Sequence, residues 1–383
     1  MRLGIFVTPG SGLPNGHTAY WDSLLEGLLG QTQHQIVIVA SERSVLPDVP
    51  APHDVVRVRH PDQRFVGAVN FDLHADALAT LEARRAGVDA LIANAQWSMP
   101  RPPRVPRIAV LYEAAFLDPA PWGVYSAYAA RQFSVPRRNV RNAAAIVCLS
   151  ETGRDDIVRH FGTPRERVVV APPALRPFPE LARSRWQPPG AYVLAVGWFH
   201  PRRDVILTLR AWRRALELGL DADLVLAGTE GPRDRVHGGI GRRVLDTVGS
   251  EFATRVYFTG AIPRADLGAL YRDASALLMT GLHEGFGIPA IEAFSFGVPV
   301  VAVDRASLRE VVAPAGVIAD ADADALANAL CDVVAAPGDG AVRRAYAATF
   351  TTERQVMPFL ALADRLDSLT APGDAPGAGL ATR

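Results

Sequence analysis

The residues best suited to chemistry lie around one turn in the last third of the chain. Glu284 stands before Gly285 and Gly287, and Glu292 follows in the first turns of a helix that Pro289 is predicted to open. Glycines let the backbone approach a ligand closely, and the free amides at a helix start attract anions. We therefore expect two carboxylates and several amides to border one cleft, which suits sugar hydroxyls or a phosphate.

Each glutamate also has a simpler interpretation. A glutamate in the first turns of a helix, such as Glu292, often caps backbone amides or interacts with the helix macrodipole. In the same view, Glu284 is an exposed loop carboxylate. The spacing alone leaves both interpretations open.

A basic pair provides a second candidate contact with phosphate. Arg202 and Arg203 follow Gly197 and a strand-like run, and they precede Asp204 and a helical pattern over 207–218. Arginine binds phosphate through two parallel hydrogen bonds. The chain contains no lysine, so all 40 of its basic residues are arginines and this role falls to arginine. The alternative is a solvated charge pair at the start of the helix.

The overall charge excludes some partners. The 40 basic residues are balanced by 40 acidic ones, so no global field attracts nucleic acid.

Cys148 and Cys331 each lie in an apolar stretch, which predicts buried thiols rather than a zinc site. Asp320, Asp322 and Asp324 have the D-x-D spacing of some metal–nucleotide sites, but they precede a helix, and helix capping is the better interpretation. We expect no metal and no other cofactor.

The elements that would position these residues alternate between short apolar runs and longer amphipathic ones, typical of an α/β protein with parallel sheets. Six prolines predict a linker over 172–190, between a first domain over 1–171 and a second over 191–350. A last helix over 351–369 precedes a tail, 371–383, that we expect to be disordered. Strands are predicted over residues 3–7, 35–40, 90–93, 108–111, 145–149, 192–196, 223–227, 255–258, 276–279 and 298–303.

Two features bear on location. Residues 1–7 are too short for a signal-peptide core, and no apolar run reaches membrane-spanning length, so we expect a cytoplasmic protein. The tyrosines and arginines of 122–141 suit a peripheral membrane contact. Pro136 interrupts this segment, and a partly buried helix is the interpretation that we favour.

Residues 284–292 resemble the E-x7-E signature of the retaining glycosyltransferase family four, and segments 256–260, 270–274, 297–301, 307–312 and 315–318 follow in family order. The resemblance is specific over about 192–330 and weak before 145. It implies a GT-B fold, in which two Rossmann-like domains face a central cleft and the last helix crosses back to the first domain. It also implies transfer of a sugar, with retention, from a nucleotide-diphosphate donor to an acceptor hydroxyl.

Carried over position by position, the resemblance places the donor on the second domain. Glu284 would contact the sugar near its 3-hydroxyl, and Glu292 would hold the ribose. Arg202 and Arg203 would neutralise the pyrophosphate, although Arg203 replaces the usual lysine and Asp204 the usual asparagine. The other donor-binding positions are Gly197, Gly260, Ala261, Ile262, Gly285, Phe286, Gly287 and Ile288.

The acceptor side is less defined. Gly16 and His17 resemble the family's glycine loop and first helix, but Tyr112 and Glu113 stand where the family commonly has His-Asp. We expect a carbohydrate, a lipid-linked molecule or a small molecule as the acceptor. The turn that carries Arg202 and Arg203, called the basic turn below, resembles that of the family and so implies a GDP-mannose-like donor. Two alternatives remain: a GT-B epimerase that needs no acceptor, and a catalytically silent binding subunit, which the Tyr112-Glu113 departure would favour.

Overall fold

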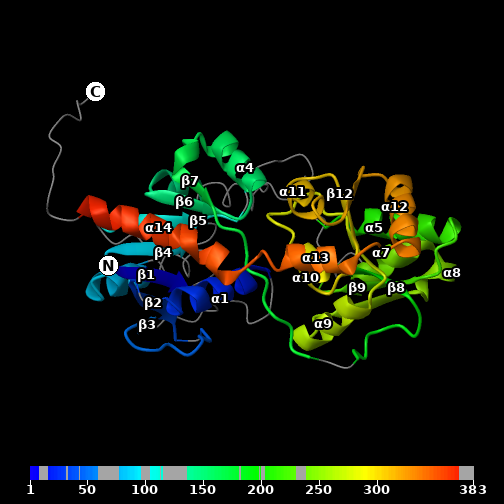
Figure 1. The fold of residues 1–383 in the computed structure, drawn as a ribbon, viewed down its shortest axis with the longest axis horizontal. Helices are drawn as coiled ribbons and strands as arrows, with labels where there is room; N and C mark the ends of the chain where they lie inside the picture. The colour runs from blue at the N-terminus through cyan, green and yellow to red at the C-terminus, as the bar shows by residue number, and fades with distance from the viewer. Residues whose placement is uncertain are drawn as a thin grey trace.

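The computed structural model describes residues 1–7, 16–31, 33–42, 44–58, 77–95, 104–112, 114, 136–180, 183–197, 199, 203–229 and 239–370. They form two parallel sheets, each flanked by helices, in two lobes that lie next to each other along the long axis (Figure 1). This is the predicted α/β arrangement of two Rossmann-like domains.

The first sheet has the strand order β3-β2-β1-β4-β5-β6-β7, and all its pairings are parallel. Leu3 and Ile5 in β1, an interior strand, are fully buried, as expected for a parallel sheet covered by helices on both faces. The strands are β1 (Arg2–Val7), β2 (Gln35–Ser41), β3 (Asp54–Val58), β4 (Ala90–Asn94), β5 (Arg107–Val110), β6 (Ala145–Cys148) and β7 (Val168–Val170).

The second sheet has the order β10-β9-β8-β11-β12-β13 and is also parallel. Its strand order reverses on the two sides of β8, and in such sheets ligands bind beyond the carboxyl ends of the strands at this point. The strands are β8 (Tyr192–Val196), β9 (Asp223–Ala227), β10 (Val256–Gly260), β11 (Ala276–Met279), β12 (Val300–Val303) and β13 (Val317–Ala319).

All ten predicted strands are present, with ends displaced by no more than two residues. Three further strands, β3, β7 and β13, were not predicted, and each lies at the edge of its sheet. β3 is mostly exposed, whereas β7 and β13 have only three residues each. Short or exposed edge strands lack the long apolar run that identifies a buried strand.

The helices pack against the sheets as the alternating pattern predicts (Figure 1). The predicted helix over 207–218 corresponds to α5. Named helices of the first domain are α1 (Gly16–Leu29), α4 (Glu151–Phe161) and the C-terminal α14 (Thr352–Thr370), and those of the second are α5 (Val205–Glu217), α7 (Gly239–Val248), α8 (Ser250–Ala253), α9 (Arg264–Asp273), α10 (Ile288–Ser295), α11 (Leu308–Val312), α12 (Ala323–Ala335) and α13 (Gly340–Ala347).

The last helix crosses back to the first domain, as predicted. In Figure 1, α14 runs along the lobe that contains α1 and β1. Gly27 of α1 lies so close to α14 that an added Cβ would be 2.4 Å and 2.5 Å from the methyl groups of Thr352 and Val356. Gln355 donates a 3.0 Å hydrogen bond to the carbonyl of Tyr20 in α1. Close helix packing and a buried hydrogen bond therefore hold the end of the chain against its beginning.

The described part of the predicted linker contains neither helix nor strand. Leu175 donates a 2.8 Å backbone hydrogen bond to Phe350, so the two crossings between the domains lie side by side. Arg176 reaches α1, where its guanidinium is 2.9 Å from Asp22 and 3.5 Å from Glu26. These contacts anchor the start of the linker on the first domain.

Among the described residues, no helix has both the length and the apolar character needed to cross a membrane. Most of the segment 122–141 lies outside the described residues, and its end forms a helix over 136–141. The tail 371–383 also lies outside them. Cys148 is buried as predicted, whereas Cys331 is only partly buried.

Candidate functional site

Glu284 and Arg203 form the centre of the candidate site. They are 81 residues apart in sequence, and the Arg203 guanidinium makes an ion pair with the Glu284 carboxylate. Glu284 is only 5% exposed, so the interpretation as an exposed loop carboxylate is wrong. Gly197 lies against the same arginine, because an added Cβ would be 2.9 Å from Arg203 Nε. The fold therefore brings the basic turn, which carries Arg203 after β8, into contact with the turn that carries Glu284 after β11.

The local backbone explains why the basic turn ends in Asp204. This residue has φ 45° and ψ 52°, in the left-handed region that asparagine and aspartate adopt more readily than most residues. Its carboxylate accepts a hydrogen bond from the amide of Leu207 and so caps α5. Aspartate therefore serves as both a turn residue and a helix cap here, and it keeps Arg203 at the start of a well-anchored helix.

The turn over residues 284–287, which we call the donor turn, leads directly into α10. Gly287 has φ 104°, a conformation that few residues other than glycine adopt, and Pro289 lies in the first turn of the helix. In the part of the chain that the structure describes, nothing accepts a hydrogen bond from the amides of Gly285, Phe286 and Gly287. These three amides are available to a ligand.

Glu292 lies in α10, where its two carboxylate oxygens have different partners. Arg264 donates to Oε1 at 2.9 Å, and the Tyr271 hydroxyl donates to Oε2 at 3.0 Å. Burial raises the pKa of Glu292 above its usual range, while Arg264 acts in the opposite direction. The helix-capping interpretation of Glu292 is therefore wrong, since its side chain binds two other side chains.

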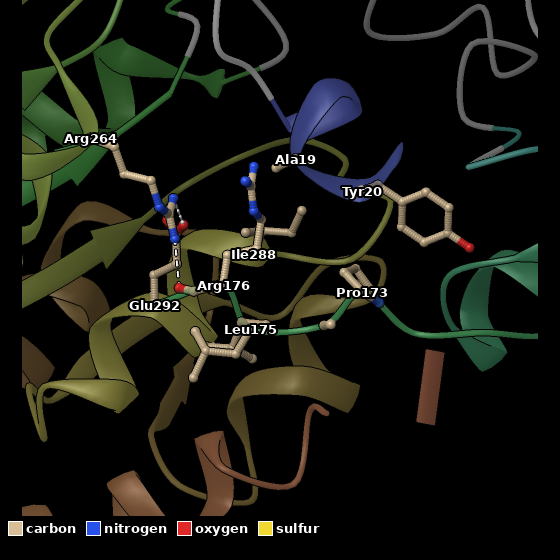
Figure 2. A pocket seen from close by; sticks show the side chains of 10 residues that line it. Ala19, Tyr20, Pro173, Leu175, Arg176, Arg264, Ile288 and Glu292 are labelled. Atoms are coloured by element: carbon tan, nitrogen blue, oxygen red, sulfur yellow. Dashed lines mark hydrogen bonds and ion pairs between the residues drawn. The ribbon is translucent and has the colours of Figure 1, made fainter. Parts of the chain in front are cut away.

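Arg264 also binds the linker, and Figure 2 shows its guanidinium beside Glu292. It donates to the carbonyl oxygens of Arg176 at 2.7 Å and Pro177 at 3.3 Å, and it lies 3.8 Å from the ring centroid of Phe178. Arginine can combine such bidentate and stacking contacts because its guanidinium is planar. One side chain thus connects the Glu292 carboxylate to the chain segment between the domains.

A pocket lies next to this arginine, between the two domains (Figure 2). Ile288 and Glu292 line it from α10, and Ala19 lines it from α1. Arg176 contributes from the linker. The predicted donor residues Ile288 and Glu292 thus face the first domain here.

Three glycines end neighbouring strands of the second sheet. Gly197 follows β8 with φ 148°, Gly228 follows β9 with φ 147°, and Gly260 ends β10 with φ 67°. A Cβ at Gly228 would lie 1.7 Å from the carbonyl oxygen of Gly197, a separation that no side chain tolerates. The backbones of two strand ends therefore touch at the carboxyl ends of β8 and β9, where a ligand would approach.

The remaining predicted positions are less closely grouped. Ala261 and Ile262 follow Gly260, with Ala261 exposed and Ile262 partly buried. Phe286 is buried and packs edge-on against Phe350, at 5.6 Å between ring centroids. Arg202 lies outside the described residues.

On the acceptor side, the structure describes Gly16 and His17 as the start of α1, and Glu113 lies outside the described residues. Tyr112 is 5% exposed, and its ring packs edge-on against Tyr20 at 5.4 Å between centroids. Burial raises the pKa of Tyr112 well above its usual value, so its hydroxyl stays protonated. Tyr112 is therefore part of the buried core and does not present an ionisable group to a ligand.

Of the three aspartates with D-x-D spacing, Asp322 caps a helix, as predicted. Asp322 accepts a 2.8 Å hydrogen bond from the amide of Asp324 at the start of α12, and Asp324 pairs with Arg214 at 2.6 Å. Among the described residues, no three histidine, cysteine, aspartate or glutamate side chains come together as metal ligands would.

Several residues of this region escaped the sequence analysis: Gly228, Arg264, Tyr271, Ser150, Ser307 and Glu310. Gly228 had a usable signal, since it follows a strand as Gly197 does. The segments already noted for their family order contain Tyr271, Ser307 and Glu310, but the roles of these residues depend on contacts with distant residues. Nothing in the local sequence marked Arg264 or Ser150.

Comparison with known families divides the chain as the two sheets do. A model described as Glycosyltransferase Family 4 matches residues 14–177, and one described as Glycosyl transferases group 1 matches residues 190–336.

Two curated relatives are mannosyltransferases. The chain is 31% identical over 202 residues to the O-antigen chain mannosyltransferase B of Escherichia coli. This match covers 48% of this chain and 50% of that protein. The chain is 28% identical over 247 residues to a GDP-mannose-dependent alpha-(1-6)-phosphatidylinositol dimannoside mannosyltransferase of Mycobacterium tuberculosis, covering 62% of each. The chain therefore matches between about half and three fifths of the length of these relatives.

Solved structures show the same fold over nearly the whole chain. Sucrose-phosphate synthase from Thermosynechococcus elongatus is similar with a TM-score of 0.72 at 18% identity, covering 96% of this chain and all of that one. HepE from Anabaena in complex with UDP-glucose has a TM-score of 0.67 at 14% identity, covering 95% and 100%.

Proposed function

We propose that this chain, which belongs to the family-four glycosyltransferases and has their GT-B fold, transfers a mannose-like sugar from a nucleotide-diphosphate donor to an acceptor hydroxyl. The donor binds to the second domain and the acceptor to the first, and the configuration at the anomeric carbon is retained.

One observation carries this proposal. The ion pair between the buried Glu284 and the partly exposed Arg203 lies beside a turn with three amides that are available for a ligand. A hydroxyl-rich sugar needs an acceptor such as the Glu284 carboxylate. A diphosphate needs cations and amide donors, which Arg203 and the donor turn supply. The two requirements of a nucleotide sugar are thus met by neighbouring groups.

The relatives support the choice of donor. Two of them are named as mannosyltransferases, and one of these as dependent on GDP-mannose. The resemblance of the basic turn to that of the family favours the same donor. HepE was solved with UDP-glucose, so a uridine donor is the natural comparison in any test.

The proposed mechanism needs no protein base. The acceptor hydroxyl attacks from the face that the diphosphate leaves, and the departing phosphate takes its proton. The C–O bond to the phosphate breaks as the bond to the acceptor forms. Arg203 and the amides of Gly285, Phe286 and Gly287 stabilise the negative charge that develops on the leaving group, and such preorganised groups often supply the largest part of catalysis.

A donor panel tests the proposal. We expect one nucleotide sugar to raise the melting temperature, with a stabilisation of about 2.7 kcal/mol at 100 times its Kd. The same donor should release nucleoside diphosphate when acceptors are added. Turnover with donor alone to an epimeric nucleotide sugar would instead identify the epimerase, and binding without any turnover would identify the silent subunit.

We also expect transfer to be independent of metal ions. Arg203 provides the countercharge at the proposed phosphate site. Of the aspartates with D-x-D spacing, Asp322 caps α12 and Asp324 pairs with Arg214. Activity should therefore be unchanged in excess chelator. The measurement is the initial rate with and without chelator, followed by added magnesium or manganese. Loss of activity that either ion restores would contradict this expectation.

A further inference from the structure

The carbonyl groups of the donor turn are held by two serines from different domains. Ser307, just before α11, lies with its hydroxyl 2.7 Å from the carbonyl oxygen of Glu284 and 3.0 Å from that of Phe286. Ser150, just before α4 in the first domain, donates to the carbonyl of Gly285 at 3.1 Å. The carbonyls of three consecutive residues, 284–286, thus each lie within hydrogen-bond distance of a serine hydroxyl.

These contacts determine where the amides of the turn point. A trans peptide is planar, so its N–H points away from its C=O. Fixing the Gly285 carbonyl on Ser150 therefore aims the Phe286 amide in the opposite direction, away from the first domain's serine. Ser307 has one hydroxyl proton, which its two neighbouring carbonyls share, and it holds the peptides on either side from within the second domain. Only the middle peptide depends on a residue of the other domain.

Ser150 is well suited to this contact. Its oxygen accepts a 3.0 Å hydrogen bond from the amide of Gly153 as the N-cap of α4, so its single proton is left for Gly285. It is fully buried, which favours a satisfied hydroxyl over an unsatisfied one.

A second contact across the domains brings Ser150 into place. Glu310 of α11 accepts hydrogen bonds from the amides of Glu151 at 3.0 Å and Thr152 at 3.1 Å. The Thr152 hydroxyl lies 3.2 Å from the same carboxylate. The first amides of a helix lack partners within it, and a carboxylate there also interacts favourably with the macrodipole. A residue of the second domain thus caps a helix of the first.

We propose that Ser150 and Glu310 are positioning residues that form an interdomain clamp, which aims the Phe286 amide at the donor phosphate only when the two domains are docked. This rests on the proposed function for the identity of the ligand. The donor turn is then complete only in the conformation that also brings the acceptor domain to the donor, so leaving-group stabilisation is linked to domain closure.

The variants separate the clamp from helix capping. Ser150→Gly removes the donor to Gly285, while glycine as an N-cap costs the helix little relative to serine. Ser150→Thr keeps the hydroxyl and should restore the wild-type behaviour. Glu310→Ala removes the second contact. Arg309→Ala is the matched control, because Arg309 is adjacent in α11 but pairs with Asp304 of its own domain.

Two measurements on the full chain test the proposal. Calorimetry with GDP and guanosine, and with UDP and uridine, should show diphosphate affinity reduced roughly 2- to 12-fold in Ser150→Gly and Glu310→Ala, the effect of one hydrogen bond, with nucleoside affinity unchanged. Small-angle X-ray scattering without ligand should show a larger radius of gyration in Glu310→Ala. Arg309→Ala should match the wild type in both.

The outcomes distinguish the clamp from the function. Diphosphate binding by the wild type, with unchanged affinity and scattering in both clamp variants, would overturn the clamp and leave the proposed function intact. Equal losses of nucleoside and diphosphate affinity would also overturn it, since a general folding defect would then explain both. No nucleotide binding by the wild type would overturn the proposed function, while the scattering would still decide whether Glu310 holds the domains together.

Discussion

Arg203→Ala is expected to slow sugar transfer by roughly 30- to 1000-fold, since a charged hydrogen bond to a developing negative charge contributes about 2–4 kcal/mol to transition-state stabilisation. Arg203 lies against the backbone of Gly197 and pairs with the buried Glu284. Among the residues of the basic turn that the structure describes, Arg203 is the positively charged side chain that reaches the donor turn. Its removal deprives the leaving diphosphate of countercharge at the moment when charge grows.

The same variant also leaves Glu284 without its partner, and this effect must be separated. Arg203→Lys keeps the positive charge and should retain much more activity than Arg203→Ala, although it loses the planar fork. The double variant Arg203→Ala/Glu284→Gln removes the unpaired buried charge. Arg214→Ala is the control for a lost ion pair, because Arg214 lies on α5 with an exposed side chain and should leave transfer unchanged.

Calorimetry identifies the role of Arg203. Binding of the nucleoside diphosphate should weaken in Arg203→Ala, while the free nucleoside should bind as before, because only the former carries the phosphates. If both ligands lost affinity equally, Arg203 would instead shape the turn, and its assignment to the leaving group would be wrong.

Glu284→Gln is expected to lower kcat by roughly 10- to 150-fold, the range for a hydrogen bond that involves a charged group. The amide keeps the shape of the side chain but loses the charge that faces Arg203 and the proposed sugar. Because we assign this contact to the reacting sugar, the loss should appear mainly in turnover.

Glu292→Gln is its matched comparison, eight residues further along. Glu292 is as deeply buried as Glu284, but its partners are Arg264 and Tyr271 and its proposed ligand is the ribose. A ground-state contact should affect KM for the donor more than kcat. Steady-state kinetics on both variants give the comparison. Wild-type values in both, or the same change in both, would contradict the separate roles of the two glutamates.

The sequence by itself determined the features that depend on neighbours along the chain. Apolar runs of four to six residues identified the central strands, because a strand buried on both faces needs them. Gly287 and Pro289 marked the start of α10 through backbone conformations that only a few residue types adopt. The resemblance of residues 284–292 and of the basic turn to one family pointed to the fold and to the candidate site for the same reason, since both are short, continuous segments.

Tertiary structure decided every feature that joins distant segments. The order of the strands brings Arg203 into an ion pair with Glu284, although the two residues are 81 positions apart in the sequence. The same order brings the backbone of Gly228 against that of Gly197. The partner of Glu292 could not be read from its own helix, because Arg264 reaches it from the start of α9. Tyr112 followed a predicted strand like a site residue, yet packing against Tyr20 buries it. Ser150 and Glu310 acquire their roles only where two separately folded domains meet, because hydrogen bonds between domains depend on docking and leave no local pattern in the sequence.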